Sequence, residues 1–303
     1  MAAGAVTICF VVAVFAPGPG PYYRSLASLH DFLHVPGFVV VTWALLFGWP
    51  ELAKTRARRL LHLAVIAAIS IGVGVAVEAA QAATGGVFDP GDVMRDVGGT
   101  AIGVLLAMIR WSEWTAAWRW ALAVGATVVL AVFLAPPLGD LADEMRARWQ
   151  FPVLADFGTA AELSRFSHSA ESRAVIEPAG PAGEHVLRLT LLPGTYPGIA
   201  FDYFPCDWRG WHHLVVTCTN PGPTPLPLTV RVHDRAHNQA YSDRYNRTFD
   251  VPPGRSEIDI PLSDVAAAPR GRTLDLAQVA GVVLFSSQLG ERRTLLIHGI
   301  RLR

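Results

Sequence analysis

Residues 78–103 read EAAQAATGGVFDPGDVMRDVGGTAIG, a polar stretch between the apolar runs LAVIAAISIGVGVAV (63–77) and VLLAMI (104–109). A carboxylate at the edge of a bilayer is costly unless it pairs or reaches water, so Glu78 is a functional candidate. Glycine at positions 98, 99 and 103 lets a neighbouring helix approach closely. The stretch predicts a polar turn between two membrane-crossing helices that pack tightly.

The composition supports a membrane setting for this turn. The chain has 303 residues, of which 51% are hydrophobic and only 17% charged, and its mean hydropathy is +0.34. These values are too apolar for an ordinary soluble protein. The formal net charge is zero, and no basic face points to nucleic acid as a partner. Membrane lipids are the expected surroundings of the apolar half.

The apolar residues are concentrated before residue 136, which divides the chain into two domains. We expect a multi-pass α-helical membrane domain over 1–136, a polar linker over 137–150 and an all-β domain over 151–303. A bilayer-spanning helix needs about 20 apolar residues, with some tolerance. About five spans are predicted, at 2–17, 35–50, 60–77, 97–111 and 118–136.

The distribution of Lys and Arg predicts the orientation. These residues gather in the loops 51–59 and 110–119, whereas the opposite loops hold only Arg24 and Arg95. Because cytoplasmic loops carry the excess of Lys and Arg, the N-terminus is expected in the cytoplasm. The localisation predicted is the cell membrane, with the turn at 78–103 and the whole C-terminal domain on the extracytoplasmic side.

Polar residues at three helix ends are expected to meet on that outer side. Glu78 and Gln81 are one turn apart at the end of one helix, and Asp31 and His34 are one turn apart at the start of another. Asp92 and Asp96 open a third helix, where the positive end of the helix dipole favours negative charge. The predicted membrane-edge polar cluster consists of Asp31, His34, Glu78, Gln81, Asp92 and Asp96.

The spacing of these residues resembles the VanZ-like family of bacterial membrane proteins. That family shows Asp-x-x-His, then Glu-x-x-Gln, then an Asp followed by an Asn and spaced glycines. Residues 31–34 (DFLH), 78–81 (EAAQ) and 92–103 (DVMRDVGGTAIG) follow this order, with Asp96 where the family usually has Asn. The resemblance covers about 20–110 and implies a cell-envelope protein connected with glycopeptide-antibiotic resistance. It implies no established reaction.

Three interpretations of the polar cluster stay open. Carboxylates with one histidine could hold a divalent cation. They could act as a general acid/base pair on a lipid-linked substrate. They could also form a hydrogen-bonded knot that fixes three helices. Whether a metal binds is unknown from sequence.

The C-terminal half predicts an antiparallel β-sandwich of the jelly-roll type. Eight short runs with period-two alternation are separated by Pro, Gly, Asn and Asp: 185–192, 198–204, 212–219, 227–234, 247–253, 256–262, 279–286 and 293–302. The stretches FPVLADFGTA (151–160), DWRGWHHLVVTCTN (207–220) and RTLLIHGIRL (293–302) resemble galactose-binding-like carbohydrate-binding modules. The resemblance covers about 150–303 and implies a glycan partner.

A polar loop after one of these strands is the candidate carbohydrate site. Loops held by a rigid sheet often carry binding residues, and sugars suit hydrogen-bonding side chains beside an aromatic ring, which Tyr241 or Tyr245 could supply. The candidates are Asp234, Arg235, His237, Asn238, Tyr241, Asp243 and Arg244. Cys206 and Cys218 could form a disulfide if their strands are adjacent, because the outer side permits oxidation.

No nucleotide-binding, zinc-protease or nucleophile-triad motif is visible, so no catalytic residue and no cofactor is predicted and a familiar enzyme is not supported. The leading hypothesis is an envelope protein that presents an outward glycan-binding module. The alternatives are a membrane enzyme or carrier acting on a lipid-linked saccharide through Glu78 and Asp92, and a structural scaffold of an envelope complex.

Overall fold

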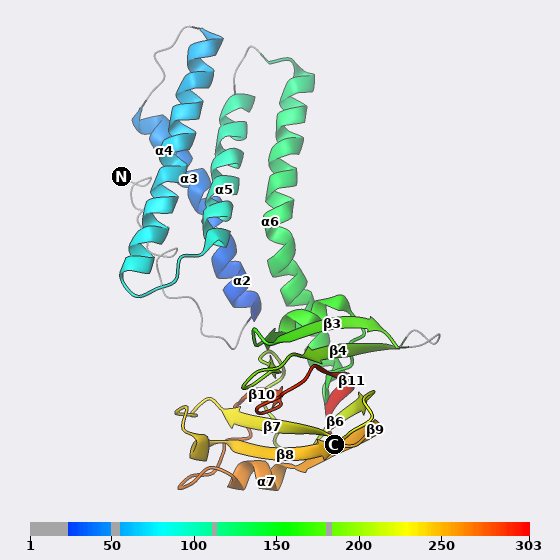
Figure 1. Cartoon of the computed structure of the whole chain (residues 1–303). Helices are drawn as coiled ribbons and strands as arrows, with labels where there is room; N and C mark the ends of the chain where they lie inside the picture. The colour runs from blue at the N-terminus through cyan, green and yellow to red at the C-terminus, as the bar shows by residue number, and fades with distance from the viewer. Residues whose placement is uncertain (1–23, 50–54, 111–113, 180–183) are drawn as a thin grey trace. The chain divides into compact units, whose positions relative to one another are not determined.

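The computed structural model describes residues 24–49, 55–110, 114–179 and 184–303. The chain divides into two compact units, Met1–Asp140 and Leu141–Arg303. The first unit is helical and the second consists mainly of β-strands (Figure 1). We refer to them as the helical unit and the β unit.

The described part of the helical unit contains four helices, and a fifth continues into the β unit. Their bounds are α2 Arg24–Phe32, α3 His34–Gly48, α4 Arg56–Ala83, α5 Pro90–Ile109 and α6 Ala116–Gln150. The start of α5 follows from its sequence. The Asp89 side chain accepts a hydrogen bond from the Gly91 N–H at 2.7 Å, and Pro90 occupies the first turn, where its missing N–H costs nothing.

Three of the five predicted spans coincide with helices long and apolar enough to cross a membrane: Arg24–Gly48, Arg56–Ala83 and Ala116–Gln150. The predicted span 97–111 falls largely within α5, which is helical but carries Asp92, Arg95 and Asp96 near its start and is not among these three. The predicted span 2–17 lies outside the described residues.

Small residues let the helices of this unit pack closely. A Cβ atom added at Gly99 of α5 would collide with the Val35 carbonyl oxygen of α3, and one at Gly98 would collide with the Phe133 ring of α6. Short side chains also link α3, α4 and α5, because Ser70 Oγ lies 3.2 Å from Thr42 Oγ1 and 3.0 Å from Thr100 Oγ1. The glycines at the end of the stretch 78–103 therefore allow close helix packing, as their spacing predicts.

The segment 137–150, predicted as a linker, is helical. It forms the C-terminal part of α6, which continues through Pro136 and Pro137. Several of its polar side chains have partners. Asp140 lies 3.1 Å from Arg24 within the helical unit, and Asp143 binds Arg165 within the β unit.

The β unit is built from two antiparallel sheets. One has the strand order β3-β4-β11-β6-β9, with β1 also paired to β11, and the other has the order β2-β5-β10-β7-β8. The strands are β1 Val153–Ala155, β2 Phe166–His168, β3 Ser172–Pro178, β4 His185–Leu191, β5 Gly198–Phe201, β6 His213–Asn220, β7 Leu226–Asp234, β8 Tyr245–Val251, β9 Gly254–Pro261, β10 Val279–Phe285 and β11 Arg293–Leu302. Short helices η1 (Ala160–Arg165), η2 (Tyr241–Asp243) and α7 (Leu262–Ala267) lie between strands.

The inner faces of the two sheets share one hydrophobic core. Leu189 and Ile297 from the first sheet and Val230 and Leu284 from the second belong to the same buried cluster. Each is flanked along its strand by more exposed positions, which is the alternation that the sequence predicts. The β-sandwich and all eight predicted strands are confirmed, and β1, β2 and β3 are additional.

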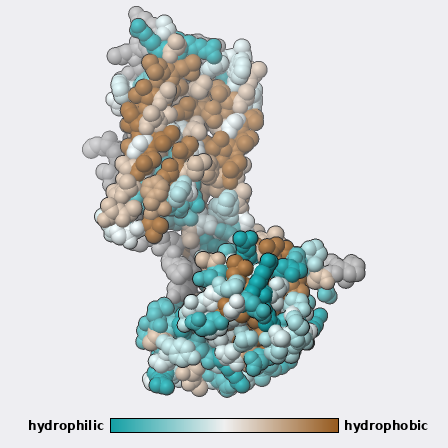
Figure 2. Space-filling model, in the orientation of Figure 1, coloured by the Kyte–Doolittle hydropathy of each residue, from teal (hydrophilic) through white to brown (hydrophobic). Residues whose placement is uncertain are grey.

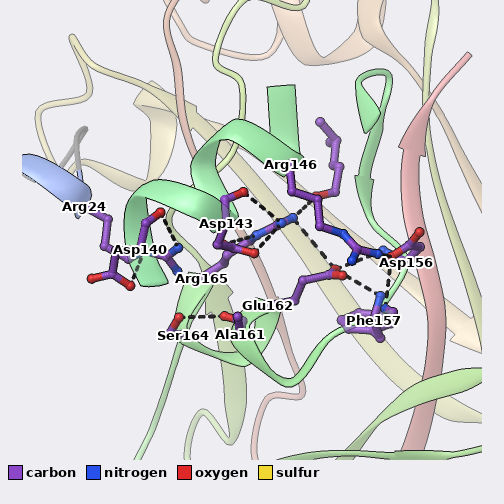
Figure 3. A network of polar contacts seen from close by, with 12 residues as sticks. Arg24, Asp140, Asp143, Arg146, Asp156, Phe157, Ala161, Glu162, Ser164 and Arg165 are labelled. Atoms are coloured by element: carbon purple, nitrogen blue, oxygen red, sulfur yellow. Dashed lines mark hydrogen bonds and ion pairs between the residues drawn. The ribbon is translucent and has the colours of Figure 1, made fainter. Parts of the chain in front are cut away.

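A buried ion pair joins the end of α6 to the β unit (Figure 3). The Arg165 guanidinium donates from Nε to Asp143 Oδ2 at 2.7 Å and from its second terminal nitrogen to Asp143 Oδ1 at 2.8 Å. It also donates to the Leu154 carbonyl oxygen at 2.9 Å. The Arg165 side chain is 1% exposed and that of Asp143 is 2% exposed. This two-pronged contact fixes the last turns of α6 against η1 and β1.

Candidate functional site

The predicted polar cluster of the helical unit is largely assembled. His34, at the start of α3, places Nδ1 2.8 Å from Asp96 Oδ1 and Nε2 3.7 Å from Asp92 Oδ2 on α5. His34 is 3% exposed and Asp96 1% exposed. Gly74 of α4 lies so close to the Asp96 carboxylate that a Cβ atom there would collide with it. Three helices therefore meet at the His34–Asp96 pair.

Arg95 is a central member of this cluster that the sequence analysis did not include. Its guanidinium contacts Asp92, lies 3.6 Å from Asp31 Oδ2, and lies 3.7 Å from Asp89 Oδ2. The spacing of Asp92 and Arg95, three residues apart on one helix, was the available signal. Arg95 offsets the negative charge that these carboxylates would otherwise concentrate.

Glu78 joins the same network through the α4–α5 turn. It is 1% exposed, and its Oε2 accepts a hydrogen bond from the Asp89 backbone N–H at 3.0 Å. Its Oε1 is buried and has no hydrogen-bond partner in the described part of the chain. Gln81, one turn further, is half-buried.

The described ranges contain no group of three or more His, Cys, Asp or Glu side chains placed to hold a metal ion. The carboxylates instead face Arg95, His34 and the backbone. The cation hypothesis for this cluster therefore gains no geometric support. The contacts fit a polar knot between helices, with one oxygen of Glu78 left unpaired.

In the β unit, part of the predicted sugar-binding loop forms an internal clamp. Arg272 places its two terminal nitrogens 2.6 and 2.8 Å from the Asp234 carboxylate, and its Nε contacts Asp243. Hydrogen bonds from Arg272, and then from the Asn238 N–H, lower the pKa of Asp243 to about 2. Burial opposes ionisation of Asp234, yet Arg272 and the Asp275 N–H hold its pKa below the usual value.

Three other predicted members of the loop also face inward or serve the turn. The His237 side chain is 1% exposed, with Nδ1 3.0 Å from the Asp243 carbonyl oxygen. Asn238 Oδ1 accepts a hydrogen bond from the Ala240 N–H at 2.9 Å, and Arg235 is half-buried. Together with Asp234 and Asp243, these residues shape the loop and do not line the groove described next.

A groove of about 700 Å³ opens on the outward face of the sheet β2-β5-β10-β7-β8. Its floor follows the strand register. Ala200, Val283, Arg231 and Asn246 are cross-strand partners from β5, β10, β7 and β8, and they form one row. Their neighbours along each strand point into the core, so the row lies on the outer face.

A second row of the floor combines glycine, an aromatic ring and two hydroxyls. Gly198, Phe285, Thr229 and Thr248 are partners across the same strands. A Cβ atom at Gly198 would collide with Phe285, so glycine is required beside this ring. Thr229 Oγ1 lies 2.8 Å from Thr248 Oγ1.

Two exposed tyrosines line the groove. Tyr196 is 61% exposed and packs edge-on against Phe285, with ring centroids 5.8 Å apart. Tyr241, from η2, is 73% exposed, and Arg244 Cζ lies 5.5 Å from the centre of its ring. The prediction placed Tyr241 and Arg244 in a site, and both line this groove. Tyr245, the other suggested ring, is buried in the core, and Tyr196 was missed because it lies far away in sequence.

The disulfide suggested between Cys206 and Cys218 is not formed, since both are free thiols. Cys218 points into the core from β6, and burial raises the pKa of its thiol. Cys206 lies outside the strands, in the loop that follows β5.

No protein-family model matches the chain, and no curated protein sequence matches it. Among solved structures, an exo-beta-agarase is similar over 50% of this chain and 24% of its own, at 20% identity and a TM-score of 0.41. The match thus spans about a quarter of that enzyme's length.

Two carbohydrate-binding modules of Clostridium thermocellum are also similar. The Family 11 module, in complex with a beta-1,3-1,4-mixed-linked tetrasaccharide, matches over 50% of this chain and 93% of its own, at 14% identity and a TM-score of 0.40. The Family 30 module of a cellulosomal cellulase matches over 46% and 89%, at 14% identity and a TM-score of 0.35.

Proposed function

We propose that this chain is a membrane-anchored carbohydrate-binding protein of the bacterial cell envelope. The observation that carries the proposal is the groove on the outward face of the sheet β2-β5-β10-β7-β8, with its two exposed tyrosines. Ligand sites are typically concave, with apolar and aromatic walls and a few polar groups that fix orientation. The ring of Tyr241 or Tyr196 would face the apolar side of a sugar, while Asn246 and the threonines would bind its hydroxyls.

The experiment is a glycan array probed with the full-length chain in nanodiscs. Retention on one class of saccharide supports the proposal, and Tyr241→Ala should weaken that binding about tenfold or more, as expected for a central aromatic anchor. Tyr241→Phe is the matched variant, because it keeps the ring and removes only the hydroxyl. Absence of retention on every glycan would contradict carbohydrate binding.

The membrane arrangement belongs to the same proposal. The helical unit would be a VanZ-like domain of five spans in residues 1–136, with α5 and residues 2–17 crossing alongside the three apolar helices. The β unit would be an extracytoplasmic jelly roll, as the Lys and Arg of the short loops favour. Protease added to intact cells should then cleave within residues 151–303. Protection from external protease, with cleavage only after lysis, would contradict this orientation.

Glu78 favours a second candidate function, an enzyme or carrier acting on a lipid-linked saccharide. Its Oε1 is buried without a hydrogen-bond partner among the described residues, which leaves one carboxylate oxygen available to a substrate. Nanodiscs containing a polyprenyl-pyrophosphate-linked disaccharide provide the probe. Turnover or binding that is lost in Glu78→Gln and Asp92→Asn, with unchanged melting, would support this function. Unchanged behaviour of both variants would contradict it.

A further inference from the structure

We infer that the groove of the β unit selects anionic saccharides, and that Arg231 and Arg244 together bind a carboxylate, sulfate or phosphate group on the glycan. The inference rests on the proposed carbohydrate binding and adds the chemical class of the ligand. It is carried by the placement of these two guanidinium groups, by their missing partners and by the charges along the groove wall.

Two guanidinium groups line the same cavity from different elements. Arg231 is on β7 in the floor row, opposite Asn246 of β8, and Arg244 follows η2 directly. Arg244 lies over the Tyr241 ring, which supports the flat face of a guanidinium and leaves its N–H edges available. Both positively charged groups are therefore held at the surface where the sugar would lie.

Neither arginine has a carboxylate partner in the described part of the chain. The Nε atoms of Arg231 and Arg244 are buried and lack a hydrogen-bond acceptor. The Oδ1 atom of Asn246, opposite Arg231, is also buried and lacks a donor. Elsewhere in the β unit, Arg188 and Arg301 each lie against a glutamate, Glu177 and Glu257 respectively. Arg188 and Arg301 thus have carboxylate partners, whereas the two arginines of the groove hold unsatisfied donors.

The formally charged side chains that line the groove, Arg231 and Arg244, are both positive. The described residues that line the groove include no aspartate or glutamate. At the rim, the Ser167 hydroxyl donates a hydrogen bond to the Asp202 carboxylate at 2.6 Å. Burial, and then the charge of Arg244, lowers the pKa of Arg231. An anion placed between the two guanidinium groups would relieve this repulsion and satisfy their free N–H groups.

Guanidinium groups bind oxyanions through paired, charge-assisted hydrogen bonds that are stronger than neutral ones. A neutral sugar hydroxyl can accept from one N–H but cannot offset the positive charge. The same chemistry would serve a uronate carboxylate, a sulfate ester or a phosphodiester on a polymer. The groove therefore discriminates by charge first, with the tyrosines and threonines contacting the sugar ring.

The test compares ligands that differ only in charge, by calorimetric titration of the full-length chain in nanodiscs. Oligogalacturonate is paired with its methyl ester, oligo-κ-carrageenan with its desulfated form, and phosphorylated dextran with dextran. We expect at least one anionic member to bind about tenfold tighter or more than its neutral partner, with affinity falling as salt rises. The three pairs distinguish carboxylate, sulfate and phosphate.

Arg231→Gln and Arg244→Gln should each remove most of that preference, and Arg231→Lys should keep part of it. Arg173→Gln is the control, because Arg173 is an exposed arginine on β3 of the other sheet. Unchanged circular dichroism of each variant excludes misfolding. Equal binding of charged and neutral partners would overturn the inference and leave carbohydrate binding standing. Binding of none of the six ligands would overturn both.

Discussion

The two units differ in the balance of apolar and polar side chains that they bury. The β unit has one large apolar core, to which both sheets contribute residues such as Leu189, Val230 and Ile297. Among the described residues of the helical unit, the apolar cluster is smaller, with Val35, Ile102 and Ala126 as its buried members. Its other buried positions include Phe38, Leu63 and Ile66, together with glycines and the polar residues His34, Thr42, Ser70, Glu78, Asp96 and Thr100. Small and hydrogen-bonded groups therefore contribute a larger share of the packing in the helical unit than in the β unit.

The surfaces of the two units also differ in polarity (Figure 2). Brown apolar residues cover the visible face of the helical unit, whereas teal polar residues dominate that of the β unit. Val73 on α4 is 42% exposed and Val128 on α6 is 56% exposed. In water such a surface would be costly, whereas in lipid it costs nothing and association depends on packing and polar contacts. The exposed apolar surface of the helical unit agrees with its three helices that are long and apolar enough to cross a membrane.

The largest effect is expected from the buried ion pair of the β unit. Asp143→Ala removes both hydrogen bonds between the Asp143 side chain and the buried Arg165 cation and leaves Glu162, 3.8 Å away, as its carboxylate neighbour, which should lower local stability by about 3–5 kcal/mol. Hydrogen exchange of β1 and η1 in the full-length chain would measure this loss. Asp207→Ala is the control, because Asp207 pairs with Arg209 on the surface and its removal should leave exchange unchanged. Equal exchange in both variants would show that burial of the pair contributes nothing.

The same substitution at exposed valines of each unit tests the difference in solvent directly. Val128 on α6 and Val175 on β3 are 56% and 55% exposed. Aspartate at Val128 should cost about 2.5–3.5 kcal/mol of membrane insertion, since a charge at the centre of a span faces lipid. Aspartate at Val175 faces water and should change stability by less than about 0.5 kcal/mol.

The fraction of each valine variant recovered in the membrane, and its melting temperature in detergent, would measure these costs. Equal recovery of Val128→Asp and wild type would contradict the proposal that α6 crosses the bilayer.

A smaller effect, with opposite signs, is expected at two glycines. Gly99→Ala places a methyl group against the Val35 carbonyl oxygen and should cost about 1–3 kcal/mol. Gly72→Ala on α4 meets nothing within 4 Å and should stabilise by up to about 1 kcal/mol, because alanine favours the helix. Thermal melting in detergent, read by loss of helix, would compare them. A loss of stability at both positions would argue against glycine-mediated packing.

Local patterns in the sequence predicted most elements. The apolar runs around 35–50, 60–77 and 118–136 correspond to α3, α4 and α6, and period-two alternation located eight strands. Strand β3 was missed because its sequence, SRAVIEP, mixes polar and apolar residues at a partly exposed edge of the sheet. The polar segment after Pro136 and Pro137 was predicted as a linker that could continue briefly as helix, and α6 extends through it to Gln150.

The sites were harder to predict because their contacts join distant residues. Helical spacing of Asp31 and His34 and of Asp92 and Asp96 pointed to the cluster of the helical unit, although Arg95 was left out. In the β unit, composition alone cannot separate Asp234, which binds Arg272, from Tyr241, which faces the groove. That distinction depends on a partner 38 residues further along the chain.

The smallest effect concerns the acid stability of the Arg272 clamp. Arg272 lowers the pKa of Asp243 to about 2, below the unfolded value of about 3.9. A depressed folded pKa stabilises the native state above pH 4, and this stabilisation is lost as pH falls from about 4 to 2. Burial lowers the pKa of His233 from about 6.5 to about 4, so the stability lost through this histidine falls mainly between pH 6.5 and 4, above this window.

Melting of the full-length chain between pH 5 and 2, followed by loss of β-structure, would isolate the clamp. Wild type should lose stability over that interval more steeply than Arg272→Gln, because the variant no longer lowers the pKa of Asp243. Arg270→Gln, an alteration two residues away that leaves the contacts of Arg272 with Asp234 and Asp243 in place, should follow the wild-type curve. Parallel curves for wild type and Arg272→Gln would mean that the clamp shapes the loop without contributing to acid sensitivity. The difference between the two units would then lie in the side chains that they bury and not in the acid sensitivity of this clamp.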